Sequence, residues 1–442
     1  MKTIIMAGGK GSRIQSVVSN IPKPMIKIDG VPVLEREIEL LRDQGFSDII
    51  ITVSHLGTVI MDYFGNGKKW GVNIQYYLEK QPLGNAGALL KIKDQLKSDF
   101  LLLNADAIFD VDFNRMVNFH QKKNALVTLF THPNSHPYDS GLLIANKDGE
   151  VKQWLTKEDN RPRYYKNRVN AGLHVINPQI LNMIDIDPEM VGKEIEGKIF
   201  KVDLDRQILK PLTVTGKIFC YDSPEYVKDM GTPERLCSVQ KDFSEGKVQS
   251  RNLKNRQKAI FLDRDGVINR YIGFLRDIDE FELVEGVSEA IKNINQSGYL
   301  CIVITNQPVI ARGEVSYEQL DDIHNKMETL LGLNGAYIDG LYYCPHHPHK
   351  GFKGEVAELK VDCECRKPKP GLLLKAAKDF NVDLSKSWMV GDSENDIKAG
   401  MNAGCKTALV NGEGSIGMHK NMGQNITVAD LKEFVDKIIL NK

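Results

Sequence analysis

The chain has 442 residues, more than one hydrophobic core usually serves, so we expect two domains. Lys and Arg together number 58, as do Asp and Glu, so no net charge draws the protein to nucleic acid or to an anionic membrane. No apolar run approaches the roughly 20 residues that span a bilayer, and Met1 leads into a strand-like segment without signal-peptide features. We therefore expect a cytoplasmic protein that acts on small molecules, with no nucleic-acid or membrane partner, and we predict no oligomeric state.

Strand-like apolar runs alternate with segments of helical period along most of the chain. From Met1 to about Gly231 this alternation predicts an α/β domain with a mostly parallel sheet covered by helices. The chain then turns polar and loses its strands before AIFLDRDG restarts the alternation at Ala259. We predict a first domain over 1–235, a linker over 236–257 and a second domain over 258–442, both Rossmann-like.

The first strand runs into a glycine-rich turn, GGKGSR, which is followed by Pro22-Lys23-Pro24. Glycines at a strand-to-helix turn let backbone N–H groups approach phosphates, and Arg13 and Lys23 can neutralise the charge of a leaving pyrophosphate. The turn is neither a Walker A motif nor a GxGxxG dinucleotide fingerprint, and alone it is compatible with an ordinary tight turn.

Three further segments favour a nucleotide site. The loop Pro82 to Gly87 is built of small residues, so a base can lie against its backbone. Asp106 follows the apolar strand FLLLN, and Asp229 lies in KDMGTP. Two carboxylates at the carboxyl ends of strands are what a Mg²⁺ ion bound to the α-phosphate requires.

With these motifs residues 1–235 resemble the sugar nucleotidyltransferases, which have a GT-A-like fold. The family's G-G-x-G-x-R and P-K-P patterns match GGKGSR and PKP. The resemblance implies that the nucleotide is bound by Gly8, Gly9, Gly11, Gly84 and Asn85, with Arg13 and Lys23 catalytic and Mg²⁺ on Asp106 and Asp229. It also implies that Lys157, Asn170 and Gly172 bind the sugar phosphate. Ala105 departs from the family, which usually has glycine before the metal-binding aspartate.

The second domain opens with a strand that delivers Asp263-Arg264-Asp265-Gly266. Residues two apart on an extended strand project to the same side, so both carboxylates can face one phosphate. One can attack phosphorus while the other protonates the leaving alkoxide and later activates water. A solvated turn is the alternative interpretation of this pair considered alone.

Three later segments remove most of that ambiguity. Thr305 and Asn306 end a strand, Arg366 and Lys367 supply positive charge, and Asp392 follows the strand SWMVG. In this order the motifs resemble the haloacid dehalogenase phosphatases over residues 258–415. The resemblance implies that Asp263 is the nucleophile, that Asp265 is the general acid/base, and that Thr305 and Lys367 stabilise the phosphoryl group. It also implies Mg²⁺ on Asp263, Asp265 (through its carbonyl) and Asp392. We expect Asp396 to orient the site from behind and Lys369 to be solvent-exposed.

Three cysteines and a histidine lie between these motifs, in CPHHP and CEC. Three thiolates and one imidazole form a closed tetrahedral zinc set with no open position for catalysis. We predict structural Zn²⁺ on Cys344, His346, Cys363 and Cys365, with His347 and His349 as spare candidates. Because Cys365 abuts Arg366, the metal would fix the loop that aims the site's cations.

The zinc loop narrows the resemblance to histidinol phosphatases and D,D-heptose 1,7-bisphosphate phosphatases, and the long insertion favours the second. Arg366 would then contact substrate, Asn306 would face the sugar phosphate, and Tyr271 to Phe274 would line the pocket. Pro308 departs from the family, which usually has Ser-Gly after the glutamine, and so removes a backbone donor. The N-terminal GGKGSRIQSVVSNIPKPM resembles the D-glycero-D-manno-heptose 1-phosphate guanylyltransferases.

Together the resemblances imply a nucleotidyltransferase joined to a phosphoric monoester hydrolase. The second half would remove the 7-phosphate of heptose 1,7-bisphosphate, and the first would transfer GMP from GTP to heptose 1-phosphate, supplying a lipopolysaccharide or another cell-surface glycan. The alternatives are an ADP-heptose or hexose product, a phosphatase for another substrate such as histidinol phosphate, or one half that serves only as a binding module.

Overall fold

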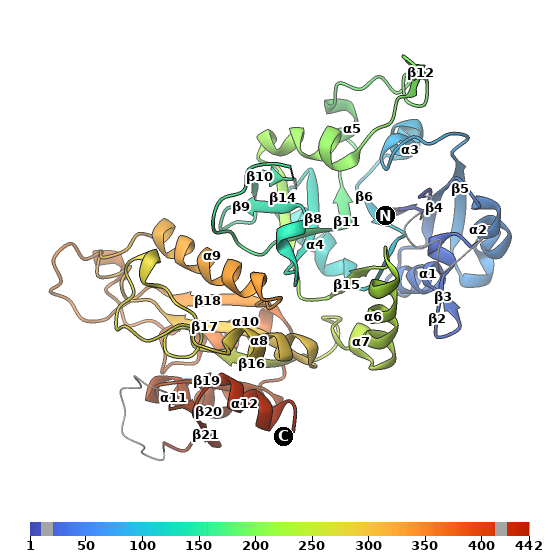
Figure 1. Cartoon of the computed structure of the whole chain (residues 1–442). Helices are drawn as coiled ribbons and strands as arrows, with labels where there is room; N and C mark the ends of the chain where they lie inside the picture. Colours follow the sequence, from blue (N-terminus) through green and yellow to red (C-terminus); the bar gives the residue numbers. More distant parts are fainter. Residues whose placement is uncertain (10–20, 157, 412–421, 442) are drawn as a thin grey trace. The chain divides into compact units, whose positions relative to one another are not determined.

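The computed structural model describes residues 1–9, 21–156, 158–411 and 422–441 (Figure 1). Its internal contacts divide the chain into two compact units. The first contains Met1–Thr131, Leu143–Leu155 and Asn170–Asn252, and the second contains His132–Leu142, Thr156–Val169 and Leu253–Lys442. Each unit is built on its own sheet, and the predicted α/β class with two Rossmann-like domains is confirmed.

The first unit has a mixed sheet in the order β10-β9-β11-β6-β1-β4-β5. In addition, β8 pairs with β11 and with β14. Strands β1, β4, β5 and β6 are parallel, whereas β11 runs antiparallel to β6. The strand bounds are β1 Lys2–Met6, β4 Asp48–Val53, β5 Asn73–Leu78, β6 Phe100–Asn104, β8 Val127–His132, β9 Leu142–Ala145, β10 Val151–Leu155, β11 Val169–Ile176 and β14 Ile218–Asp222. Met6 pairs with Asn104, so the turns that follow β1 and β6 emerge side by side.

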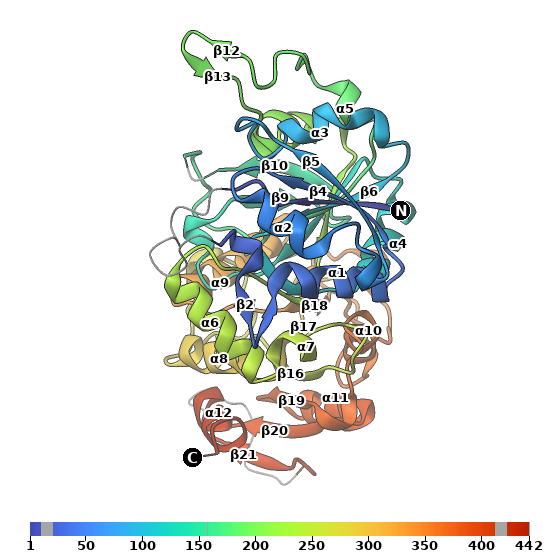
Figure 2. The same cartoon turned by 90° about the vertical axis from the view of Figure 1, so that its right-hand side faces the viewer.

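Two apolar layers cover this sheet, one on each face. The layer of α1 (Val33–Asp43), α2 (Gly57–Phe64) and α4 (Phe113–Lys123) includes Ile38, Phe64 and Met116. The opposite layer includes Leu89 and Leu90 of α3 (Gly87–Lys91), and Figure 2 shows α3 and the α1–α2 pair on opposite sides of the parallel strands. The apolar stripe of α1 recurs every three to four residues, as helix burial on one side requires.

Smaller elements complete the first unit. The short pairs are β2 (Lys27–Ile28) with β3 (Val31–Pro32), β7 (Ala107–Asp110) with β15 (Tyr226–Asp229), and β12 (Glu194–Ile195) with β13 (Lys198–Ile199). The remaining helices are α5 (Ile180–Met183), α6 (Pro233–Ser244) and α7 (Lys247–Ser250). Much of the predicted linker is therefore helical, and its Val239 and Val248 share a buried cluster with Ile28.

The second unit has a sheet in the order β18-β17-β16-β19-β20-β21, whose neighbouring strands are all parallel. The bounds are β16 Lys258–Leu262, β17 Tyr299–Asn306, β18 Gly340–Cys344, β19 Trp388–Gly391, β20 Lys406–Val410 and β21 Ile426–Val428. Leu262 pairs with Val303 on one side and Val390 on the other. The carboxyl ends of β16, β17 and β19 therefore meet at one edge, where α/β sheets place their ligands.

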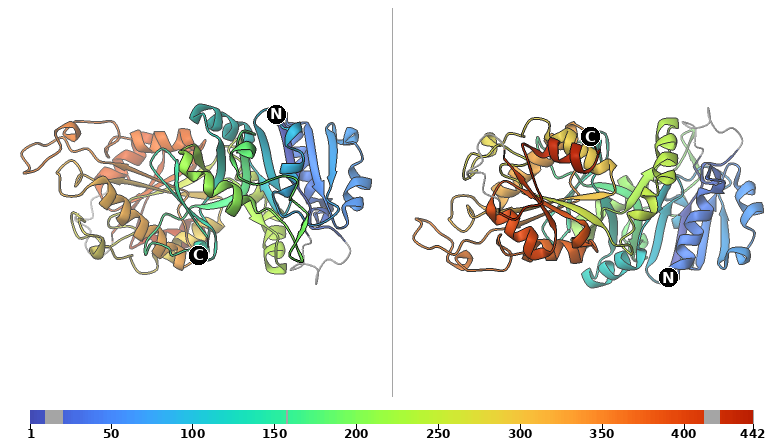
Figure 3. Two further views of the ribbon diagram at one scale, coloured as in Figure 1. Left: turned by 90° about the horizontal axis from the view of Figure 1, so that it is seen from above. Right: turned by 90° about the horizontal axis from the view of Figure 1, so that it is seen from below.

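Helices cover both faces of this second sheet (Figure 3). One apolar layer contains side chains of α8 (Val287–Gln296), α9 (Tyr317–Leu333) and α12 (Leu431–Ile438), and the other contains side chains of α10 (Gly371–Asp379) and α11 (Glu394–Ala403). Ser316 caps α9 in a reciprocal arrangement with Gln319, which satisfies two donors at the helix start.

The second unit also includes two short segments from earlier in the chain, 132–142 and 156–169. The Tyr165 N–H donates to the Thr329 hydroxyl on α9, and that hydroxyl donates to the Tyr165 carbonyl. The Asn167 N–H donates to the Glu328 carboxylate one residue earlier on the helix. Among the described residues no helix is long and apolar enough to cross a membrane.

Candidate active sites

A cavity of about 600 Å³ opens at the carboxyl ends of β1 and β6 in the first unit. The described lining residues are Met6, Ala7, Gly8, Gly9, Lys23, Pro24, Thr52, Glu79, Pro82, Leu83, Gly84, Asn85, Ala88, Asn104, Ala105, Asp106, Lys201 and Gly231. The cavity brings together the glycine turn, the PKP segment, the small-residue loop and Asp106, which are far apart in the sequence. Gly11, Arg13 and Lys157 lie outside the described residues.

The glycine turn passes close to its neighbours. A Cβ on Gly8 would lie 2.9 Å from Glu79 Oε1, so a larger residue would press on that carboxylate. The Ser54 hydroxyl donates to the Gly8 carbonyl and fixes the turn beside β4. Because Gly8 and Gly9 both line the cavity, their backbone lies where phosphates are expected.

Lys23, Asp106 and Asp229 lie close together in the fold, and of these Lys23 and Asp106 line the cavity, whereas Asp229 is not among the described residues that line it. Lys23 is nearly buried, and its Nζ lies 3.2 Å from Asp106 Oδ2. Asp229 pairs with Ala107 across the β7–β15 ladder, which places it beside Asp106 in the fold. Burial opposes ionisation of Asp229, but the Gly231 N–H and the Arg235 guanidinium outweigh it and lower the pKa. Arg235 was not predicted to take part, and it already bridges both Asp229 oxygens.

The loop over 82–87 is held by its contact with the segment before Leu204. Gly84 has φ +84°, and a side chain there would collide with the Val202 carbonyl. The Asn85 Oδ1 accepts the Leu204 N–H at 2.7 Å, so this side chain shapes the loop while lining the cavity. Ala105 is buried, its N–H donates to the Met6 carbonyl, and it lines the cavity together with Asp106.

Asn170 and Gly172, the predicted sugar-side residues, are not among the described residues that line the cavity. They lie on β11 next to it. Gly172 has φ +76° and a side chain there would collide with the Asn104 amide, which does line the cavity. The Asn170 side chain accepts the Gly172 N–H at 3.2 Å.

Sequence reasoning missed Glu79, a carboxylate that lines this cavity in addition to Asp106. It follows β5, and its backbone N–H donates to the Val53 carbonyl. Burial raises its pKa, against a weaker opposing effect of the Leu83 N–H. Its position directly after a strand and before the small-residue loop was the available signal.

A second cavity, of about 220 Å³, lies at the carboxyl edge of the sheet in the second unit. Its lining residues are Asp263, Asp265, Tyr271, Gly273, Phe274, Leu275, Thr305, Asn306, Gln307, Pro308, Val309, Arg366, Lys367, Asp392, Ser393 and Asn395. Every residue predicted for catalysis in this domain is among them, and they come from the ends of β16, β17 and β19 and from the segment before α10.

Lys367 is the cation at the centre of this site. Its Nζ is 2.8 Å from Asp263 Oδ1, 2.5 Å from Asp396 Oδ1 and 2.8 Å from the Ile304 carbonyl. Burial alone would lower the pKa of Lys367, but Asp263 and Asp396 raise it to about 12, so the side chain stays charged. Burial and the nearby Asp396 raise the pKa of Asp263, and Lys367 counteracts them.

Carboxylate oxygens of Asp263, Asp392 and Asp396 lie within 4.8 Å of one another. Gly266 has φ +84°, and any side chain there would collide with Asp392 Oδ2, so this glycine lets the segment with Asp392 approach the segment with Asp263. Burial and Asp396 raise the pKa of Asp392 to about 7. Crowded carboxylates that resist ionisation fit a hard divalent cation such as Mg²⁺, which would neutralise them.

Side chains at the end of β17 contact one another and the segment with Lys367. The Thr305 hydroxyl accepts the Gln307 amide at 2.9 Å and lines the cavity. Asn306 accepts the Lys367 N–H and donates to the Lys367 carbonyl, both at 3.1 Å, so it positions that lysine. Pro308 also lines the cavity, and its carbonyl accepts the N–H of Arg312.

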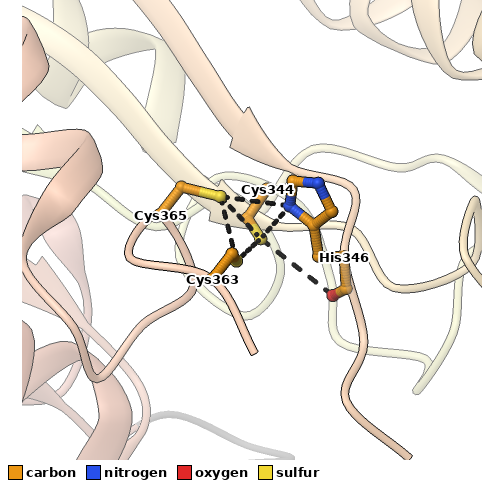
Figure 4. A group of neighbouring side chains, drawn as sticks. All are labelled: Cys344, His346, Cys363 and Cys365. Carbon is orange, nitrogen blue, oxygen red and sulfur yellow. Dashed lines mark hydrogen bonds between the residues drawn. The ribbon is translucent and has the colours of Figure 1, made fainter. Parts of the chain in front are cut away.

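The three cysteines and the histidine converge as predicted (Figure 4). Sγ atoms of Cys344, Cys363 and Cys365 lie 3.1 to 3.5 Å apart, and His346 Nδ1 lies 3.2 Å from Cys365 Sγ. A disulfide needs a sulfur separation near 2.05 Å, so the thiols are free, as Figure 4 shows. Four soft donors around one point fit a tetrahedral zinc ion. His347 and His349 instead contact each other.

This cluster is joined directly to the segment that contains Arg366 and Lys367. Arg366 follows Cys365, and its Nη1 donates to the His346 carbonyl at 3.2 Å. The Gly371 N–H donates to the Glu364 carbonyl, and a side chain at Gly371 would collide with that carbonyl. The cluster thus fixes the backbone on both sides of Arg366 and Lys367.

Comparison with known proteins assigns a family to each half. The nucleotidyl transferase family model matches residues 2–246, and the HAD-hydrolase-like model matches residues 364–433. D-glycero-beta-D-manno-heptose-1,7-bisphosphate 7-phosphatase from Pasteurella multocida is 44% identical over 154 residues, which is 35% of this chain and 81% of the relative. The enzyme of the same name from Escherichia coli K12 is 38% identical over 183 residues, which is 40% of this chain and 94% of the relative.

Solved structures resemble each half separately. HddC from Yersinia pseudotuberculosis aligns with 55% of this chain and 99% of its own, at 24% identity and a TM-score of 0.45. D,D-heptose 1,7-bisphosphate phosphatase from B. bronchiseptica aligns with 42% of this chain and all of its own, at 33% identity and a TM-score of 0.37.

Proposed function

Because this chain belongs to the nucleotidyl transferase family and, through its second half, to the HAD-type heptose-bisphosphate phosphatase family, we propose that it performs two consecutive steps on one heptose. The phosphatase unit removes the 7-phosphate of D-glycero-D-manno-heptose 1,7-bisphosphate. The other unit then joins heptose 1-phosphate to GMP from GTP and releases pyrophosphate. The observation that carries this proposal is the presence of two separate cavities, each lined by the charged groups of one of these reactions.

In the phosphatase reaction a carboxylate oxygen of Asp263 attacks phosphorus at C7, and the bond from phosphorus to the sugar oxygen breaks. Asp265 gives that oxygen its proton, and the phosphoryl group stays on Asp263 as an acyl phosphate. Asp265 then takes a proton from water, whose oxygen attacks phosphorus, so the bond from phosphorus to Asp263 breaks, inorganic phosphate is released and the Asp263 carboxylate is restored. Lys367 offsets the negative charge, and Mg²⁺ bound at Asp263, Asp392 and the Asp265 carbonyl would add charge stabilisation.

In the transferase reaction the phosphate oxygen of heptose 1-phosphate attacks the α-phosphorus of GTP in line, and pyrophosphate leaves. No protein nucleophile is needed, so positioning and charge neutralisation supply the rate. Gly8 and Gly9 offer backbone donors, and Lys23 lies beside Asp106 where the leaving charge is expected. Mg²⁺ at Asp106 and Asp229 would hold the α-phosphate, which requires Arg235 to share Asp229.

We assign zinc at Cys344, His346, Cys363 and Cys365 a structural role. A closed set of four protein donors leaves no position for substrate. Its function is to hold the segment with Arg366, whose guanidinium lines the phosphatase cavity.

Glu79 supports guanine as the base. A carboxylate accepts hydrogen bonds only, and the guanine edge offers two neighbouring donors, N1–H and N2–H₂. Adenine offers a lone pair at N1, which a carboxylate repels. Glu79 lines the same cavity as the phosphate-side glycines, so a base and phosphates can share it.

The proposal is tested by supplying heptose 1-phosphate with GTP or ATP to wild type and to Glu79→Gln, with exposed Glu189→Gln as the matched control. The variant should lose about 10- to 100-fold in kcat/KM for GTP and much less for ATP. The reason is that the glutamine side chain places its NH₂ group, a hydrogen-bond donor, against one of the two donors of the guanine edge. A wild-type preference for ATP would overturn the guanine assignment, and no turnover of the heptose with either nucleotide would overturn the substrate.

A further inference from the structure

Asp265 is held at both carboxylate oxygens by three neighbouring side chains. Arg264 Nη2 lies 2.9 Å from each oxygen, and Arg264 Nε lies 3.2 Å from Oδ1. Asn269 Nδ2 donates to Oδ1 at 3.0 Å, and Gln307 Nε2 donates to Oδ2 at 2.9 Å. Since a carboxylate oxygen has two lone pairs, these donors occupy all of them. A substrate atom can reach an Asp265 carboxylate oxygen only when one of these contacts opens.

The Gln307 contact is the one that can open toward substrate. Gln307 is 2% exposed and lines the cavity, whereas Arg264 and Asn269 are not among the described residues that line it. The Gln307 amide also donates to Thr305 Oγ1 and accepts from Arg264 Nη2, so it keeps two partners when it leaves Asp265. Asp265 Oδ2 is therefore the oxygen that can meet a leaving group, while Arg264 and Asn269 keep the carboxylate in place.

Arg264 in turn is held by His324 of α9, which the reaction scheme above does not use. Arg264 Nη1 lies 3.2 Å from His324 Nε2. A guanidinium only donates, so Nε2 carries a lone pair and the neutral ring has its proton on Nδ1. Burial, and then the charge of Arg264, hold the pKa of His324 well below its usual value. Its helix neighbours Ile323 and Met327 are core residues, so the imidazole sits on a rigid support.

We propose that His324 is a positioning residue for the phosphatase reaction, acting through Arg264 to orient the Asp265 carboxylate so that Oδ2 faces the leaving oxygen. The inference rests on the proposed acid/base function of Asp265. Without an acceptor at position 324, Arg264 Nη1 is a buried donor that has lost its His324 partner. The guanidinium group that donates to Asp265 can then rotate.

The test separates proton donation from stability by changing the leaving group. The full-length enzyme with Mg²⁺ is assayed on p-nitrophenyl phosphate, whose leaving group departs without a proton, and on phenyl phosphate, whose poorer leaving group needs one. His324→Leu removes the acceptor, and His324→Gln places an amide oxygen near the position of Nε2. Thr329→Val is the control, because Thr329 is a buried polar residue of the same helix bonded to Tyr165 and not to Arg264.

We expect His324→Leu to lower kcat/KM for phenyl phosphate by about 10- to 100-fold and that for p-nitrophenyl phosphate far less, with most of the loss restored in His324→Gln. Equal losses on both substrates, no recovery in His324→Gln, or a gain in rate would overturn the proposal. Nitrogen NMR of the wild type gives an independent check: a protonated Nε2 would also overturn it. Neither readout uses a heptose, so failure of the heptose assignment remains distinguishable.

Discussion

Replacing Lys367 with methionine removes the charge that separates two buried carboxylates. Lys367 is 2% exposed, Asp263 is 13% exposed and Asp396 is fully buried, and the ammonium lies within 2.8 Å of both carboxylates. Methionine nearly matches the length of the aliphatic stem, so the change removes the ammonium group with little loss of packing. The two acids are left without their common partner, and Asp396 is fully buried.

Removing one partner of a buried ion pair costs about 3–5 kcal/mol, because the remaining charge has no compensation. For a unit of about 200 residues each kcal/mol of lost unfolding free energy lowers Tm by about 2–4 °C. The Tm of Lys367→Met in EDTA should therefore fall by about 6–20 °C. The phosphatase kcat should fall by about 10²- to 10³-fold with Mg²⁺ present, since one group that stabilises the transition-state charge is lost.

The assay uses the full chain and measures calorimetric unfolding, phosphate release and nucleotide transfer on the same samples. Lys369→Met is the matched control, because Lys369 lies two residues away and its partners Asp362 and Glu364 are exposed. Transfer to heptose 1-phosphate should continue in both variants. The reasoning would be refuted if Lys367→Met unfolded at the same temperature as Lys369→Met, or if it kept wild-type phosphate release.

Three further predictions concern the metal sites. Burial, and then Asp396, raise the pKa of Asp392 to about 7 without metal, and Asp263 shifts in the same direction, so Mg²⁺ must displace protons. Calorimetric Mg²⁺ affinity of the phosphatase site should therefore rise between pH 6 and 8, and a flat profile would contradict the donor set. By the same linkage, the raised pKa of Asp392 stabilises the metal-free folded state relative to the unfolded chain at low pH, where this carboxyl group is protonated. That stabilisation falls as pH rises from about 4 to about 7. Cys363→Ser should lower the zinc content measured by mass spectrometry and reduce phosphatase activity, with exposed Cys237→Ser unchanged; equal zinc in both would remove the zinc assignment.

Much of the phosphatase site could be predicted from sequence because its groups sit at strand ends. Asp263, Thr305 and Asp392 each lie at or directly after the end of an apolar strand, and parallel strands bring those ends to one edge. The four proposed zinc ligands could be predicted equally well, because Cys and His residues at short spacing in the sequence indicate a metal site.

Contacts made across long stretches of chain could not be predicted in this way. Nothing local in the sequence indicates that His324 contacts Arg264, sixty residues earlier in the chain. The amide of Asn306 was predicted to face substrate, and the structure shows both its donor and its acceptor on Lys367. The polar composition of 236–257 indicated a linker, but the few apolar residues there are spaced so that α6 and α7 bury them.

The central claim is that one chain removes a phosphate at one site and activates the same sugar at the other. Phosphorus NMR of heptose 1,7-bisphosphate with GTP and Mg²⁺ tests it most directly, using wild type, Asp263→Asn and Asp106→Asn. We predict that wild type loses the 7-phosphate first and then forms GDP-heptose with pyrophosphate, that Asp263→Asn leaves the bisphosphate intact, and that Asp106→Asn accumulates heptose 1-phosphate. A nucleotide sugar that retains the 7-phosphate, or phosphate release that survives Asp263→Asn, would contradict the account.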